Sequence, residues 1–359
     1  MTDALTEPDG SGSTPPTRRT SPFVRVLQVT LGLGLAVAML WWGLPHFAKT
    51  SWAEVGHVLR TVPAWKAALF MALVVVGLYC YTFVMTGAMQ GLSHLRALIL
   101  NVCGSSVSNL LPGGGAVGLA ATYSIAKSWG FSAASVTTMA VVTGVWNVLA
   151  RVALPIIAVL GLAWGATDLP TTMREAAWAA VLSGTAIVVV FALAVGTDAG
   201  ARQLGRAIDR LVRLIRRGHG DTVEAGLTGL RARTAETVRT GWLSMTLGMA
   251  GFFGLYYVLF LLCTQTTGIE LPFGQLFAAY AIGRLLTAVG VTPGGLGVTE
   301  TGTAAALVAW GADPASAMAG VVLFSIFTHF MEIPLGALGW IAWSLMPRAS
   351  AEERAAAEA

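Results

Sequence analysis

Long apolar runs separated by short polar stretches dominate the chain. A helix that crosses a bilayer needs about 20 consecutive apolar residues. Six runs approach or exceed that length, and they lie at about 26–44, 64–90, 133–164, 175–196, 242–263 and 315–345. None of them alternates with period two, which disfavours a transmembrane β-barrel. The pattern predicts an all-α, polytopic membrane protein.

Two further apolar regions, 97–128 and 273–310, are each broken in the middle by proline and glycine. The breaks are the sequences Leu-Pro-Gly-Gly-Gly at 111–115 and Thr-Pro-Gly-Gly-Leu-Gly at 292–297. Because the shorter arms do not reach the length of a full crossing, we expect two re-entrant helical hairpins, with new helices beginning near Val117 and Val298. The alternative is that some arms cross fully, which would give eight to ten spans.

Composition and charge narrow the class of protein. Only 11% of the residues are charged and 55% are hydrophobic, too few charges to cover the surface of a soluble enzyme or a nucleic-acid-binding protein. The charges concentrate in the two ends and in the segment 197–240. We therefore expect a disordered tail at 1–22, a single transmembrane domain at 23–346 and a second tail at 347–359, with a short interfacial helix at 50–62.

The distribution of arginine predicts the topology. The segment 197–240 carries nine arginines against five acidic residues, so the positive-inside rule places it, as a loop against anionic lipid, in the cytoplasm. Counting crossings from there puts both termini in the cytoplasm. The layout is about six transmembrane helices plus two hairpins that enter from opposite sides.

The two breaks coincide when the chain is shifted by 181 residues. Nine of the 24 positions from 112 to 135 are then identical, including Thr122 with Thr303. Self-similarity at a fixed offset indicates a repeat, here with units around 97–164 and 273–345. Because three expected crossings separate the hairpins, the units have opposite orientation. Inverted repeats with broken helices are typical of transporters, whose binding site lies near the midplane.

The same offset aligns two ionisable residues inside expected spans, Arg151 and Glu332. Such residues are expensive in a membrane and usually face the protein interior or a pathway. We expect either a buried ion pair that joins the repeats or a gate.

The breaks also carry the candidate binding chemistry. Helix N-termini near the midplane favour an anion, and glycine lets a phosphate approach the backbone. We expect substrate-binding residues among the breaks, their hydroxyl neighbours and two charged residues: Pro112, Gly113, Gly114, Gly115, Thr122, Arg284, Pro293, Gly294, Gly295, Gly297, Thr299, Glu300 and Thr301.

The two charged members of that set leave alternatives open. Arg284 could pair with Glu300 or with a lipid phosphate. Glu300 could complement the helix dipole, worth about 0.3–1 kcal/mol, take up a proton, or hold a cationic head group. On the last two alternatives its charge matters, and Glu300→Gln should lose most transport.

Motifs for other activities are missing from the sequence. The five histidines are scattered and no C-x-x-C occurs, so we expect no metal site and no cofactor. No G-x-x-x-x-G-K-[ST] motif supports ATP-driven transport, and no hydrolase or metalloprotease motif supports catalysis. We expect no enzyme activity, and movement of a substrate that is passive or coupled to an ion gradient.

The two broken motifs, with the Trp-Gly-Ala-Asp-Pro sequence at 310–314 and the final long span, resemble the lysylphosphatidylglycerol synthase transmembrane (flippase-like) family. The resemblance covers about residues 25–345. It implies a multi-pass plasma-membrane protein associated with lipid translocation, here the membrane module without the soluble synthase domain. The family tends to carry an arginine where Ser325 stands in this chain.

We therefore expect a flippase-like protein that binds or translocates an anionic lipid, a phospholipid or a polyprenyl-phosphate-linked one. The alternatives are a secondary transporter of small anions or solutes, and a membrane enzyme or accessory subunit that acts on lipid-linked glycans. The expected partner is membrane lipid and not nucleic acid. A homo-oligomer and a separate lipid-modifying enzyme remain open.

The expected topology can be tested by cysteine labelling. A cysteine introduced at Asp168, between the expected spans 133–164 and 175–196, should react with a membrane-impermeant reagent added to intact cells, because this turn is expected outside. Labelling only after permeabilisation would contradict the layout.

Overall fold

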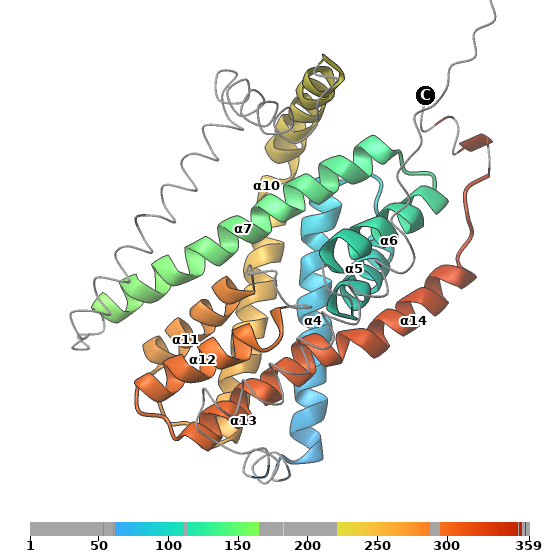
Figure 1. The fold of residues 1–359 in the computed structure, drawn as a ribbon. Coiled ribbons are helices and arrows are strands. Elements are labelled where there is room, and N and C mark those ends of the chain that lie inside the picture. The colour runs from blue at the N-terminus through green and yellow to red at the C-terminus, as the bar shows by residue number, and fades with distance from the viewer. Residues whose placement is uncertain are drawn as a thin grey trace, which may run out of the picture.

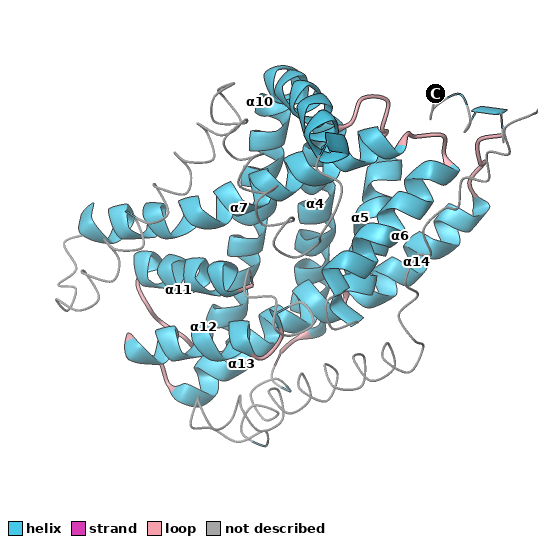
Figure 2. Cartoon of the chain, turned by 45° about the horizontal axis from the view of Figure 1, so that its top comes forward, coloured by secondary structure: helices cyan, strands magenta, loops and turns pink. Residues whose placement is uncertain are grey.

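A computed structural model describes residues 62–110, 114–164, 221–287 and 295–350, together with a few single positions outside these ranges. Every element in them is a helix (Figure 2). The expected spans at 26–44 and 175–196, the interfacial helix at 50–62 and the first half of the arginine-rich segment lie outside the described residues, as do most of the two tails.

The helices follow the predicted boundaries closely. They are α4 (Ala64–Ala88), α5 (His94–Leu110), α6 (Gly114–Ser128), α7 (Ala133–Trp164), α10 (Asp221–Thr266), α11 (Phe273–Leu286), α12 (Val298–Ala309), α13 (Pro314–Ser325), the π-helix η3 (Ile326–Phe330) and α14 (Glu332–Leu345). The second break ends at Val298, as predicted. In the first, α6 begins at Gly114, three residues before the predicted start, so two glycines expected in the turn belong to the helix.

Four of the six predicted spans are confirmed as helices long and apolar enough to cross a membrane: Ala64–Ala88, Ala133–Leu162, Glu236–Thr266 and Pro314–Leu345. The four hairpin arms are shorter, with 17, 15, 14 and 12 residues in α5, α6, α11 and α12. The described chain is therefore that of a multi-pass membrane protein whose apolar helices fall into two length classes.

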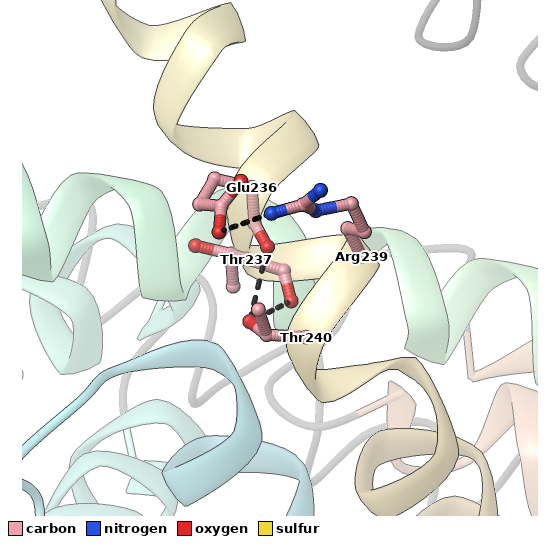
Figure 3. A network of polar contacts seen from close by, with 4 residues as sticks. All are labelled: Glu236, Thr237, Arg239 and Thr240. Carbon is pink, nitrogen blue, oxygen red and sulfur yellow. Dashed lines mark hydrogen bonds and ion pairs between the residues drawn. The ribbon is translucent and has the colours of Figure 1, made fainter.

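Helix α10 differs from the prediction. The segment 197–240 was expected to be a loop, but from Asp221 onward it is helical and continues into the apolar span. No proline lies between 221 and 240, so nothing there interrupts the hydrogen-bond ladder of the helix. Near the apolar part, Arg239 and Glu236 form an exposed ion pair with an N···O distance of 3.2 Å (Figure 3), which adds little stability at a solvated surface.

The long helices form the frame of the fold. Helices α4 and α10 pack together at the centre and run in opposite directions (Figure 1). Helix α7 and the α13–η3–α14 segment also run in opposite directions (Figure 1). The hairpin of α5 and α6 and the hairpin of α11 and α12 lie on either side of the central pair (Figure 1). Helix α5 packs on α14, whereas α11 packs on α7. Each hairpin is thus held by the long helix of the other half.

The central pair approaches closely because small residues face each other. A Cβ atom on Gly241 would overlap the carbonyl group of Gly87, and one on Gly248 would meet Cys80 and Val84 of α4. Ser244 donates a hydrogen bond of 3.0 Å to the carbonyl oxygen of Phe83. Small residues and interhelical hydrogen bonds are the usual means of joining helices where water provides no driving force.

The two halves share helix ends at the 181-residue offset. Helix α7 spans 133–164, and α13 to α14 span 314–345. The side chain of Ser132 accepts a hydrogen bond from the Ser135 amide, and at the same offset Asp313 accepts from the Ser316 amide. The two long segments therefore begin with the same cap.

The turns before these caps also coincide. Gly130 and Gly311 both have positive φ, 87° and 95°, a conformation that glycine adopts without strain. The amide of Phe131 bonds to the Ala126 carbonyl, and that of Ala312 to the Leu307 carbonyl, the 6→1 bond that ends many helices. The halves differ at 326–330, where the second has a π-helix and the first stays α-helical.

Glycine substitutions on α10 test the close approach. We expect Gly241→Ala to lower stability by about 1–3 kcal/mol, because the new methyl group meets rigid backbone. Gly254→Ala is the matched control on the same helix, since nothing lies within 4 Å of its Cβ position. It should raise stability by about 0.5–1 kcal/mol. Thermal unfolding in detergent measures both, and equal shifts would contradict the packing.

Candidate functional site

A cavity of about 520 Å³ lies between the two hairpins. Its walls come from both hairpins, from both central helices, from α7 and from the η3–α14 segment. Pockets lined by groups from several elements, with a few convergent polar side chains, are the usual form of ligand sites. The cavity is therefore the candidate functional site.

The first hairpin presents a polar wall. Asn101, Ser105 and Ser108 line the cavity from α5, at spacings of four and three residues that place them on one helix face. The Ser108 hydroxyl donates to the Gly114 carbonyl across the hairpin at 3.1 Å. A Cβ on Gly118 would overlap Ser108 and Gly104, so small residues let the two arms of this hairpin touch.

Arg151 enters the cavity from α7. Its Nε donates to Asn147 Oδ1, one turn earlier, at 2.6 Å. Its Nη1 donates to the Thr287 hydroxyl and, at 3.5 Å, to the Arg284 carbonyl. These bonds tie α7 to the C-terminal end of α11.

Glu332 enters from the opposite wall, at the start of α14, with an exposed fraction of 8%. Its Oε2 accepts a hydrogen bond of 3.1 Å from the Asn109 amide of α5. Within the described part of the chain, no salt bridge joins Glu332 to Arg151. The direct ion pair that the repeat suggested is not formed. Instead, each residue holds the hairpin of the other half.

The side chain of Arg284 is buried in the site without a hydrogen-bonded partner among the described residues. It is 7% exposed, and its guanidinium lies over the rings of Tyr280 and Phe324 at 5.6 and 5.1 Å. Its Nε has no hydrogen-bond partner, and the side chain makes neither a hydrogen bond nor an ion pair in the described chain. It interacts with the carboxylates of Glu300 and Glu332 only at longer range. Of the two partners that the sequence left open for Arg284, Glu300 and a lipid phosphate, Glu300 does not form a salt bridge with it.

Glu300 is placed differently from what the sequence suggested. It is 1% exposed and does not line the cavity. Its Oε2 accepts from the Gly297 amide at 2.6 Å, and its Oε1 accepts from the Ser325 hydroxyl at 2.5 Å. The first bond caps α12 and the second joins α12 to the end of α13. Both carboxylate oxygens are thus used within the protein.

The cavity gathers about half of the predicted site residues. Gly114, Gly115, Thr122, Arg151, Arg284, Gly295 and Glu332 line it. The remaining described ones, Gly297, Thr299, Glu300 and Thr301, lie in the first turn of α12 and do not line it. Pro112, Gly113, Pro293 and Gly294 lie outside the described residues.

Several polar lining residues were missed by sequence reasoning. Tyr256 of α10 is 1% exposed and its hydroxyl has no partner. Thr143, Asn147 and Arg151 follow each other at four-residue spacing, a polar stripe on an otherwise apolar span that could have been found. Thr287 carries no comparable signal, since its role depends on the approach of α7. The other lining residues not predicted as substrate-binding include Asn101, Ser105, Ser108, Asn109, Thr328 and His329.

The cavity gathers charged and polar groups that could bind a charged ligand. Two arginines and one glutamate share a cavity whose walls also carry hydroxyl and amide groups. Charged groups at membrane depth usually mark a pathway for a polar substrate. Among the residues that the structure describes, no cluster of three or more His, Cys, Asp or Glu could hold a metal ion.

Comparison with known proteins identifies the family of the chain. A search of curated proteins finds no match. The family model described as the lysylphosphatidylglycerol synthase TM region matches residues 29–336, which include all described helices up to the first turns of α14. The chain therefore belongs to the lysylphosphatidylglycerol synthase transmembrane family.

Proposed function

We propose that the protein binds the anionic head group of a membrane lipid in the cavity between the hairpins and moves that lipid between leaflets. The observation that carries the proposal is the buried guanidinium of Arg284, which makes no hydrogen bond or ion pair among the described residues, although it lies near enough to interact electrostatically with the carboxylates of Glu300 and Glu332. A buried cation is costly unless hydrogen bonds satisfy it. A phosphate that two arginines can reach would supply those hydrogen bonds, and arginine matches the geometry of phosphate well.

Arg151 supports the same interpretation. Its Nη1 bonds to the Arg284 carbonyl and its Nε to Asn147, so its guanidinium is fixed in orientation and lies on the same wall as Arg284. Glu332 and its partner Asn109 are part of the first-hairpin side of the cavity. The cavity therefore holds two cationic side chains, suited to phosphate, together with one acidic residue.

The family and the helix lengths favour a lipid over a soluble anion. The chain belongs to a family named for a lipid synthase, and four described helices are long enough to span the bilayer. We propose binding and transport without a chemical step. A small-anion carrier and an enzyme acting on lipid-linked glycans are separate outcomes of the experiments below.

The arrangement of the halves suggests how a lipid could move. We propose that they form an inverted repeat, with α4 to α7 as one unit and α10 to α14 as the other. Three observations support this: coincident helix ends and caps, antiparallel central helices, and reciprocal packing of each hairpin on the other unit. In such proteins, rocking one unit against the other exposes a fixed midplane site alternately to each side. The hairpins would then be re-entrant, with both termini cytoplasmic.

Replacing Arg284 tests the head-group site. We expect Arg284→Gln to reduce leaflet exchange of fluorescent phosphatidylglycerol in reconstituted vesicles about tenfold or more, because hydrogen bonds to charged groups contribute about 1.5–3 kcal/mol. Arg239→Gln is the matched control. Arg239 is exposed on α10, outside the cavity, and its loss should leave the rate unchanged.

Three results would contradict this proposal. Lipid exchange at the wild-type rate in a folded Arg284→Gln protein would show that Arg284 does not bind the head group. Uptake of radiolabelled phosphate without lipid exchange would identify a small-anion carrier. A chemically altered lipid in the product analysis would identify an enzyme.

Substitutions of Glu300 test whether this residue serves the structure through its hydrogen bonds or serves transport through its charge. Gln can keep both contacts, because its oxygen can accept from Gly297 and its amide can donate to Ser325. We therefore expect Glu300→Gln to retain both near-native stability and lipid exchange. Glu300→Ala leaves buried donors unpaired and should cost about 1–3 kcal/mol, measured by thermal unfolding. A folded Glu300→Gln protein without exchange would instead show that the carboxylate takes part in transport.

A further inference from the structure

A second cavity, also of about 520 Å³, lies between α7, α10 and α11. On α10 its wall includes the small residues Thr246, Ala250 and Gly254, at four-residue spacing, and α7 contributes Ala150 and Ala153. Large apolar side chains complete the wall, among them Leu154, Ile157, Met249 and Phe253. The small residues leave space between the larger ones. We call this cavity the α7–α10 groove.

The polar groups that line the groove are already satisfied within the protein. The indole of Trp146 donates to the Thr246 hydroxyl at 3.2 Å, and that hydroxyl bonds to the Trp242 carbonyl at 2.7 Å. The Tyr257 hydroxyl donates to the Phe273 carbonyl at 3.1 Å. An occupant would thus meet hydrocarbon surface with no free hydrogen-bonding group. This contrasts with the head-group cavity, where Tyr256 and Arg284 have unpartnered polar atoms.

The groove and the head-group cavity are neighbours. Phe253 belongs to the walls of both. Helix α7 also serves both, since Asn147 and Arg151 line the polar cavity while Ala150 and Leu154 line the groove. A polar cavity and an apolar groove thus share three helices, α7, α10 and α11, and one aromatic side chain. An amphiphile is the ligand whose two ends match two such sites.

We infer that the α7–α10 groove holds an acyl chain of the lipid whose phosphate is bound by Arg284 and Arg151. The inference rests on the proposed function for its head-group site. It adds that the ligand is a phospholipid with a hydrocarbon chain and not a free anion, and that the chain has its own site on the protein. The bilayer around the helices supplies such chains, and the wall shared at Phe253 places a chain in the groove beside a head group in the cavity.

Photolabelling can distinguish this site from ordinary lipid contact. The probe is phosphatidylglycerol with a diazirine in one acyl chain. It is added as a minor component to phosphatidylcholine vesicles that contain the full-length protein. After irradiation, mass spectrometry measures label at Ala153 and Ala250 in the groove. Leu338 and Ile341, exposed on α14 at 62% and 57%, are the internal reference for chains that touch the protein from the bilayer.

We expect strong label in the groove that depends on the head-group site. In Arg284→Gln the groove label should fall about tenfold, as for the loss of a charge-assisted hydrogen bond, while label on α14 stays constant. Ala250→Trp should fill the groove and remove its label. Leu247→Trp, on the same helix but outside the groove, should not.

Two results would overturn the inference. One is groove label that matches the α14 reference and does not respond to Arg284→Gln, which would indicate ordinary bilayer contact. The other is the absence of label in the groove. Because labelling requires binding but not translocation, its outcome is independent of leaflet exchange. If the label depends on Arg284 but the protein does not exchange lipid between leaflets, the acyl-chain site in the groove is supported and the proposed transport is contradicted.

Discussion

In the proposed arrangement the two hairpins are broken helices at membrane depth, where lipid cannot satisfy the backbone amides and carbonyls that each break leaves without partners. The first arms have 17 and 14 residues. The long helix of the opposite half packs on each of them, α14 on α5 and α7 on α11. Helices of the same half also pack on the hairpins, α4 on α5 and α13 on α12, so each hairpin is held by both halves.

The charged residues also make contacts from one half to the other. Arg151 of the first half bonds to Thr287 beside the second hairpin, and Glu332 of the second half bonds to Asn109 of the first. Because these side chains are used at the hairpins, they do not neutralise each other across the cavity. Arg284 makes no ion pair in the described chain, and the proposed phosphate site rests on this observation.

Much of the architecture was predictable from the sequence. Apolar run lengths gave the described spans to within a few residues, and proline with glycine located the hairpins, because both signals are local. The contacts of Arg151, Glu332 and Glu300 were not predictable, since they depend on which helices meet. The offset correctly aligned Arg151 with Glu332 but could not show that each faces a hairpin. The first turn of α12 holds Glu300 away from the cavity, a consequence of the capping bond to Gly297.

The most direct test of the account is an electron cryomicroscopy map of the full-length protein in nanodiscs that contain phosphatidylglycerol. The account predicts head-group density in the cavity between the hairpins, with phosphate oxygens within hydrogen-bonding distance of the Arg284 guanidinium. A map in which Arg284 forms an ion pair with Glu300 or Glu332, and in which the cavity holds no lipid density, would contradict it.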